Sequence, residues 1–197
     1  MKLLFGYYHS RLGSQSVDEI TIQLKGPAVP LRTSLESSPE TVQEFEAASQ
    51  ERYLEGLELM LANQCGAGVY LMGYAAEIVL KEAYFRLIGS GLTDRVGTLL
   101  PPARTWGRAN LPQPISDDES YHSLRFWAAL LCARRTGLGK PFPPAFESEL
   151  LRTSSRLYVA WWVEMRYHVL SQASLGDARD VYNDVTWIIS NRLQLWS

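Results

Sequence analysis

The chain has 197 residues, of which 46% are hydrophobic and 20% are charged, and its formal net charge is −2. These values are typical of a folded protein with one main domain and a sizeable core. The near balance of charge excludes a basic field over the whole surface, so it argues against non-specific nucleic-acid binding while leaving a local basic patch open.

The cysteines, the histidines and the apolar stretches narrow the class further. Cys65 and Cys132 each lie in an apolar, helix-like context, which indicates free buried thiols. No cluster has the spacing of metal ligands, so we expect neither a metal nor a cofactor. The stretch from Gln64 to Ala76 is too short to span a membrane, and the start of the chain is too weakly apolar for a signal peptide. We therefore expect a cytoplasmic protein that does not associate with membranes.

Residues 1–37 differ in pattern from the rest of the chain. Apolar and polar residues alternate over residues 20–25, which is the period of a β-strand. Residues 3–8 can pair with them across a turn rich in serine and glycine. We expect a small N-terminal β-hairpin with a linker over residues 1–37, followed by a helical domain over residues 38–197.

The first long helix is expected to run from Ser38, which can cap it, to about Asn63. Seven glutamates between Glu36 and Glu58 are accompanied by a single basic residue, Arg52. We interpret these glutamates as a solvated acidic face, with an acidic docking surface as the alternative.

The stretch from Ala67 to Leu87 is apolar or small on nearly every side, which is typical of a helix at the centre of a bundle. Glu77 and Lys81 lie one helical turn apart near its middle, and such charges require partners when they are buried. A glycine turn over residues 64–68 predicts that this helix folds back antiparallel on the first one.

Residues 92–118 are expected to form an irregular connection because they contain four prolines. Arg95, Arg104 and Arg108 lie around Trp106 in this stretch. Arginine next to an aromatic ring can bind phosphate and stack on a base. We prefer solvated arginines as the interpretation and keep nucleic-acid binding as the alternative.

Three further helices complete the expected fold. They run from Glu119, after two capping aspartates, to about Thr136, from about Ala145 to Tyr167, and from a capping Asp177 to about Leu193. The core face of the helix that begins near Ala145 is expected to hold Leu150, Leu151, Leu157, Val159, Trp161 and Trp162. The sequence therefore predicts an all-α, antiparallel bundle of about five helices.

The end of the helix that is expected to reach Tyr167 carries the densest group of reactive side chains. Glu164 and His168 are four residues apart and would share one helical face. Arg166 can hold a phosphate through its guanidinium group. The alternative is an ion pair between Arg166 and either Glu77 or Glu164 that joins this helix to the central one.

The stretch from Tyr70 to Phe85, YLMGYAAEIVLKEAYF, resembles the second helix of HEPN-domain proteins, where small residues accompany a Gly-Tyr-Ala-x-Glu and Leu-Lys pattern. A Tyr-His-x-Leu helix at Tyr121 to Leu124 and a Glu-Met-Arg-Tyr helix end at Glu164 to Tyr167 come after it in a similar order. The resemblance covers roughly residues 40–193. It implies a HEPN-like helical fold.

Many members of that family are metal-independent ribonucleases that use an arginine followed, after four to six residues, by a histidine. Arg166 matches the arginine, but His168 stands only two residues after it. The positions expected for the histidine hold Ser171, Gln172 and Ala173. The motif therefore lacks the imidazole that general acid–base cleavage of RNA requires.

We accordingly expect a non-catalytic HEPN-like module that binds a nucleotide, RNA or a partner protein, such as a nucleotidyltransferase. The residues expected to hold the ligand are Glu77, Lys81, Glu164, Arg166 and Tyr167. One alternative is a toxin-type, metal-independent endoribonuclease with Arg166 and His168 as catalytic residues. Another is a structural subunit of a protein complex. We also expect a homodimer, because short helices and six tryptophans leave apolar surface to cover and because related domains pair.

Overall fold

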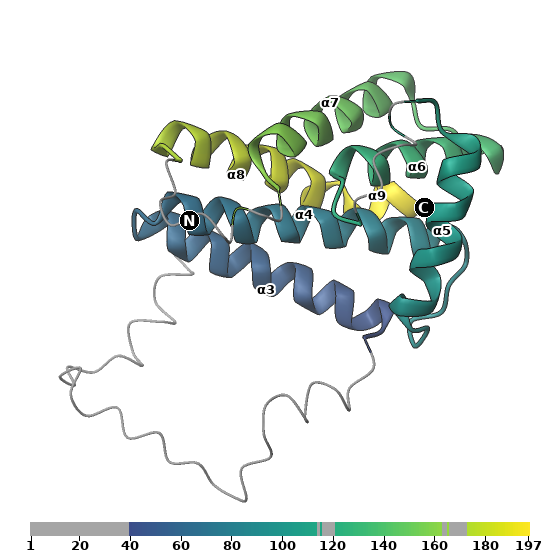
Figure 1. Ribbon diagram of the computed structural model, residues 1–197, viewed down its shortest axis with the longest axis horizontal. Coiled ribbons are helices and arrows are strands. Elements are labelled where there is room, and N and C mark those ends of the chain that lie inside the picture. Colours follow the sequence, from purple (N-terminus) through teal and green to yellow (C-terminus); the bar gives the residue numbers. More distant parts are fainter. Residues whose placement is uncertain (1–39, 114, 116–120, 163–164, 166–172) are drawn as a thin grey trace, which may run out of the picture. The chain divides into compact units, whose positions relative to one another are not determined.

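The computed structural model describes residues 40–113, 115, 121–162, 165 and 173–197, and these contain seven α-helices and no β-strand (Figure 1). The helices are α3 (Val42–Leu61), α4 (Cys65–Leu87), α5 (Val96–Asn110), α6 (Leu124–Gly137), α7 (Pro144–Ala160), α8 (Leu175–Ser190) and α9 (Arg192–Trp196). The all-α class is therefore confirmed. The hairpin expected over residues 1–37 lies outside the described residues.

Helix α4 is the central element of the described helices. Helices α3, α6, α8 and α9 all pack against it, and Figure 1 shows α3 running beside it along much of its length. Most of its 23 residues are buried. A helix that is apolar on nearly every side can be satisfied only by neighbours on every side, so the sequence prediction for this stretch is confirmed.

The chain reverses between α3 and α4 at residues 62–64, rather than over the glycine turn expected at 64–68. Asn63 has a φ of 60°, in the left-handed region that turns the chain sharply. Gly68 lies inside α4 instead, where the two helices approach closely. A Cβ atom added there would lie 2.9 Å from the backbone oxygen of Gly56 in α3.

The observed helix starts differ from those expected because other side chains provide the caps. Helix α3 begins after Thr41, not at Ser38, and α6 begins after Ser123, well beyond Glu119. Helix α8 begins after Ser174. In each case a Ser or Thr oxygen accepts a hydrogen bond from a backbone N–H of the first turn. Asp177 is the carboxylate of a capping box rather than the cap itself.

Helix α5 occupies most of the segment that was expected to be irregular, so that prediction is wrong. Pro101 and Pro102 lie inside the helix and cannot donate to the carbonyls of Gly97 and Thr98. Both of those residues are exposed, so water can satisfy their carbonyl groups. The usual cost of an internal proline is thereby reduced.

Helix α7 ends at Ala160, not at Tyr167 as expected, because Trp161 leaves it in an extended conformation (φ −136°, ψ 134°). The indole Nε1 of Trp161 donates a 2.9 Å hydrogen bond to the backbone oxygen of Tyr70 in α4. The ring is buried against Gly73, where an added Cβ would lie 2.2 Å from it. Docking this indole on α4 takes the backbone out of the helix.

The early end of α7 also corrects its expected core face. Val159 is 79% exposed and Trp162 is 44% exposed, so neither belongs to the core, although Trp161 does. Helix α7 therefore does not carry Glu164 and His168, which lie outside the described residues.

Two further expectations can be compared with the structure. Cys65 and Cys132 are both free and buried, as expected, and burial raises the pKa of the Cys132 thiol to about 12, so it stays protonated near neutral pH. Among the described helices, none combines the length and apolar character that crossing a membrane requires.

The contact between Gly73 and Trp161 predicts a specific sensitivity. Gly73→Ala should lower the free energy of unfolding by about 1–3 kcal/mol, because the added methyl group overlaps a buried indole that has no room to move. The matched control is Gly97→Ala in α5, where nothing lies within 4 Å of the added Cβ, and it should leave stability unchanged or slightly raised. Urea denaturation followed by circular dichroism measures both. Equal midpoints for the two variants would contradict the packing argument.

Candidate functional site at the Glu77 carboxylate

Glu77 and Lys81 form a buried ion pair on α4. They are one turn apart, as their spacing predicts, and only 3% and 5% exposed. The Lys81 ammonium donates to Oε1 of Glu77, and it also lies 5.4 Å from the centre of the Trp127 ring. The pair is therefore shielded from water on the side of α6, where its Coulomb attraction is strong.

The second carboxylate oxygen of Glu77 contacts a histidine from another part of the chain. Nδ1 of His122 lies 2.9 Å from Oε2 of Glu77. His122 precedes α6 in a turn that is fixed on both sides. The Trp127 indole donates to the backbone oxygen of Tyr121, and the Ser123 hydroxyl caps the helix.

Aromatic rings surround the Glu77–His122 contact. The Tyr74 ring meets the His122 ring edge to face, with centroids 6.1 Å apart, and meets the Trp161 ring at 5.2 Å. The Tyr70 hydroxyl donates to the Tyr74 hydroxyl over 3.2 Å. Ring contacts of this kind hold the imidazole in one orientation over the buried carboxylate.

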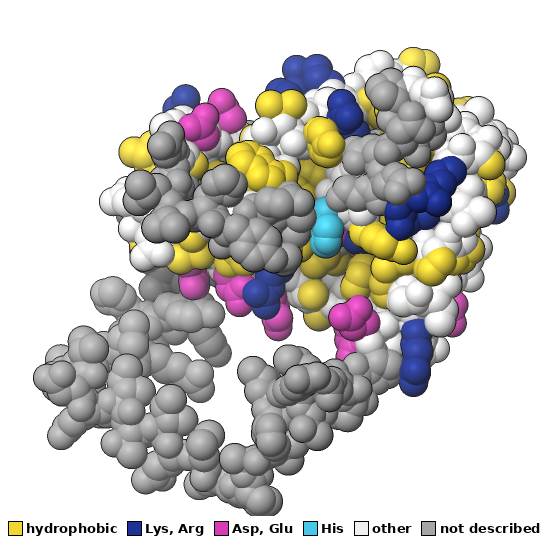
Figure 2. Space-filling view, viewed as in Figure 1, with side chains coloured by type: hydrophobic (Ala, Val, Ile, Leu, Met, Phe, Trp, Pro, Cys, Tyr) yellow, Lys and Arg dark blue, Asp and Glu magenta, His cyan; other side chains and the backbone are white. Residues whose placement is uncertain are grey.

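The His122 side chain also reaches the surface. It is 37% exposed, whereas Glu77 beneath it is almost fully buried. Figure 2 shows histidine at the surface of the described residues beside hydrophobic side chains. When Glu77 accepts a hydrogen bond from Nδ1, Nε2 becomes the basic nitrogen of the neutral ring. A carboxylate that orients an imidazole in this way is the usual arrangement of a general acid–base group.

The sequence identified part of this cluster. Glu77 and Lys81 are together, as expected. Glu164, Arg166, Tyr167 and His168 lie outside the described residues, so their relation to Glu77 remains a prediction. His122 was not expected in the site, and the helix in which the family resemblance placed it begins only after it, at Leu124. The 45 residues between Glu77 and His122 leave no local spacing that reveals their contact.

The arginines expected around Trp106 have different aromatic partners. Arg104 stacks on Tyr121, with its guanidinium carbon 3.9 Å from the ring centre. Trp106 is instead covered by Arg134 from α6, at 5.2 Å. Arg104 therefore brings a cation to the residue that precedes His122.

Among the described residues, no group of three or more His, Cys, Asp or Glu side chains is placed to hold a metal ion. No family model, curated protein or solved structure matches this chain.

The buried pair predicts a non-additive response to substitution. Glu77→Gln should lower the free energy of unfolding by about 3–5 kcal/mol, because Lys81 is left as a buried cation without a counter-ion. The double variant Glu77→Leu/Lys81→Met should lose much less, because no charge remains to be desolvated. Chemical denaturation measures both. A double variant at least as unstable as Glu77→Gln would show that the ion pair itself contributes the stability.

Proposed function

We propose that the chain is a HEPN-like module that binds a nucleotide or RNA at the surface around His122. The observation that carries this proposal is the 2.9 Å contact between the exposed imidazole of His122 and the buried carboxylate of Glu77. The resemblance over Tyr70 to Phe85 supports it, because that stretch contains Glu77 and forms the central helix.

The helices expected from the sequence can be matched to observed elements. Helices α3, α4, α6, α7 and α8 correspond to the five expected, and we propose that they form the HEPN-like bundle, with α5 and α9 added. In this proposal residues 1–37 form the N-terminal hairpin extension.

The burial of Glu77 and Lys81 refines their proposed roles. Side chains that are 3% and 5% exposed have almost no surface to offer a ligand, so they act by positioning His122. Arg104 is the described cation nearest in sequence that can attract a phosphate to this surface, through its place on Tyr121. Glu164, Arg166 and Tyr167 remain the proposed further ligand contacts.

A second candidate function is metal-independent cleavage of RNA, and the Glu77–His122 contact favours it specifically. The sequence motif lacks a correctly spaced histidine, and His122 can supply that imidazole. In this reaction an imidazole takes the proton of a ribose 2′-hydroxyl, whose oxygen attacks the neighbouring phosphate. A protonated group then gives a proton to the departing 5′-oxygen, which leaves a 2′,3′-cyclic phosphate and a 5′-hydroxyl. Arg166 would stabilise the phosphate charge, and His168 would be the second acid–base group.

Binding and cleavage can be measured on the same proteins. Fluorescence anisotropy with a labelled single-stranded RNA at low salt should show binding, and His122→Ala should weaken it by about tenfold through loss of a polar contact. The matched control is His9→Ala, which removes a histidine outside the helical domain and should bind as the native chain does. Absence of affinity for RNA and for nucleotides at low salt would contradict the binding proposal.

For cleavage, the same RNA is incubated with the protein in excess chelator. If the chain is a ribonuclease, His122→Ala should slow cleavage by about 100-fold or more, as expected for loss of an acid–base group. Cleavage that survives His122→Ala, Arg166→Ala and His168→Ala would contradict the mechanism.

We further propose a homodimer, with a nucleotidyltransferase-type protein as the heterologous partner to be tested. The exposed apolar side chains at the end of α7, Val159 and Trp162, support an interface there. Light scattering after size exclusion should give twice the chain mass, and Val159→Glu should shift it toward the single mass because a charge would enter the interface. A native chain that is monodisperse as a monomer at micromolar concentration would contradict the proposal.

A further inference from the structure

A second charged cluster lies on a different face of α4 from Glu77. At 3.6 residues per turn, Glu82 and Arg86 point about 140° away from Glu77 and Lys81. Nε of Arg86 donates to Oε1 of Glu82 over 2.8 Å, and Arg192 from α9 approaches the same oxygen at 3.6 Å. The cluster shares no residue with the His122 site, so a ligand bound here would be independent of the proposed function.

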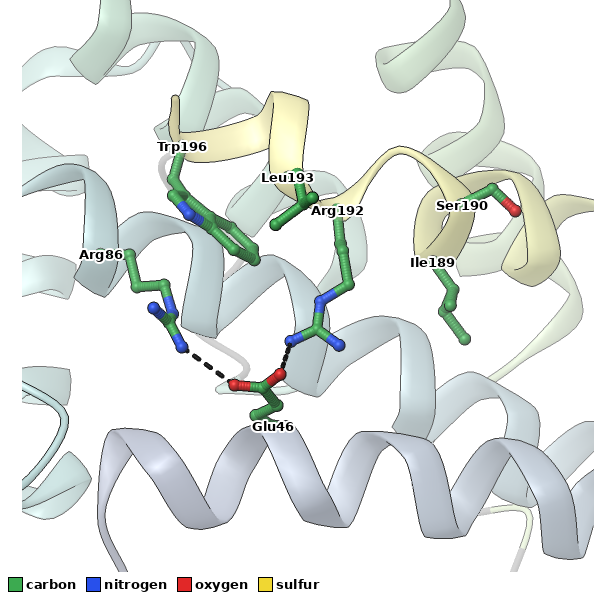
Figure 3. Close-up of a pocket in the computed structure, with 7 residues that line it drawn as sticks. All are labelled: Glu46, Arg86, Ile189, Ser190, Arg192, Leu193 and Trp196. Carbon is green, nitrogen blue, oxygen red and sulfur yellow. Dashed lines mark hydrogen bonds and ion pairs between the residues drawn. The ribbon is translucent and has the colours of Figure 1, made fainter.

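The carboxylate of Glu46 bridges the two arginines of this cluster. Its Oε2 lies 3.0 Å from Nη2 of Arg86, and its Oε1 lies 2.6 Å from Nη2 of Arg192 (Figure 3). The three side chains come from three different helices, α3, α4 and α9. A carboxylate held between two guanidinium groups occupies the position that a bound anion would take.

The bridge lies in a pocket with an apolar wall. The pocket has a volume of about 510 Å³ and is lined by Glu46, Arg86, Ile189, Ser190, Arg192, Leu193 and Trp196. Figure 3 shows both arginines directed toward Glu46, beside the Trp196 ring. Their guanidinium carbons lie 5.0 Å and 5.7 Å from the centre of that ring. The pocket therefore joins two oriented cations to an aromatic and aliphatic surface.

The hydrogen bonding of the arginines is incomplete with Glu46 in place. Nε of Arg192 is buried and has no hydrogen-bond partner among the described residues, and the same holds for Oε2 of Glu82. A carboxylate has two oxygens, and Glu46 uses one for each arginine. A phosphate group has three terminal oxygens, so it can accept from both Nη2 groups and from this remaining N–H.

The two carboxylates differ in how easily they can yield to a ligand. Glu46 is 38% exposed, so water can solvate it after it swings away from the arginines. Glu82 is fully buried, and burial raises its pKa, so protonating it is easier than protonating a carboxyl in water. With Glu46 displaced and Glu82 neutral, two guanidinium charges remain to face a phosphate dianion.

We propose that this pocket binds a phosphomonoester carried by an aromatic body, with Arg86 and Arg192 holding the phosphate, Trp196 contacting the ring, and Glu46 occupying the phosphate position in the unliganded protein. Glu46 is therefore a competitor for the ligand. Its removal should tighten binding, whereas a purely structural ion pair would show no such gain.

The test is isothermal titration calorimetry of the full chain with phenyl phosphate, adenosine 5′-monophosphate and inorganic phosphate. Glu46→Gln should bind phenyl phosphate about fivefold tighter than the native chain, because the internal carboxylate no longer competes. Arg192→Lys should bind it about tenfold more weakly, because lysine cannot offer the paired donors of guanidinium. Inorganic phosphate should bind more weakly than both aromatic esters, and comparing these two distinguishes a nucleotide from a simple aryl phosphate.

Matched controls separate local from general effects. Glu55→Gln removes another glutamate of α3 that pairs with an arginine, and Arg152→Lys changes an exposed arginine of α7; both should bind as the native chain does. His122→Ala should also leave this binding unchanged, which separates this pocket from the site proposed above. The proposal is overturned if neither the native chain nor Glu46→Gln binds phenyl phosphate, if Arg192→Lys binds it equally well, or if inorganic phosphate binds as tightly.

Discussion

Helix α4 contains three charged side chains that are almost completely buried, Glu77, Lys81 and Glu82. An ionised group in such surroundings needs partners, or the fold loses several kcal/mol. Glu77 and Lys81 satisfy each other within the helix, and His122 adds a contact from the turn before α6. Glu82 depends on arginines from α4 and α9. The burial of these charges thus determines where distant segments must dock, and both candidate sites arise from it.

The parts of the fold that could be predicted from the sequence are those set by local pattern. The central helix, its buried ion pair and the two buried thiols are all determined by which residues neighbour one another along the chain. The end of α7 is not, because it depends on whether Trp161 can reach Gly73, which lies 88 positions earlier and leaves room only for want of a side chain. The helical state of Pro101 and Pro102 depends likewise on water reaching the preceding turn of α5.

The candidate sites show the same division. Glu77 was identified because an acid in an apolar helix is conspicuous, and its spacing from Lys81 is a helical one. His122 was not identified because its contact spans a helix, a turn and an indole hydrogen bond, none of which leaves a periodic signal. The pocket at Arg86 was missed for a related reason. Its members stand at positions 46, 86 and 192, and the glutamates of α3 have the pattern of a solvated face, although Glu46 lies between two arginines.

The close contact of the glycines in α3 and α4 has a consequence for the axial register of the two helices. An added Cβ at Gly56 would meet the Met72 side chain at 2.9 Å, so the two antiparallel helices interlock at this level. Counting toward the start of α3 and toward the end of α4 from that contact brings Glu46 level with Glu82. A slide of one helical turn, about 5.4 Å, would carry Glu46 away from the arginines. The glycines near the α3–α4 turn therefore act as a ruler that sets which charges meet at the far end of the same pair of helices.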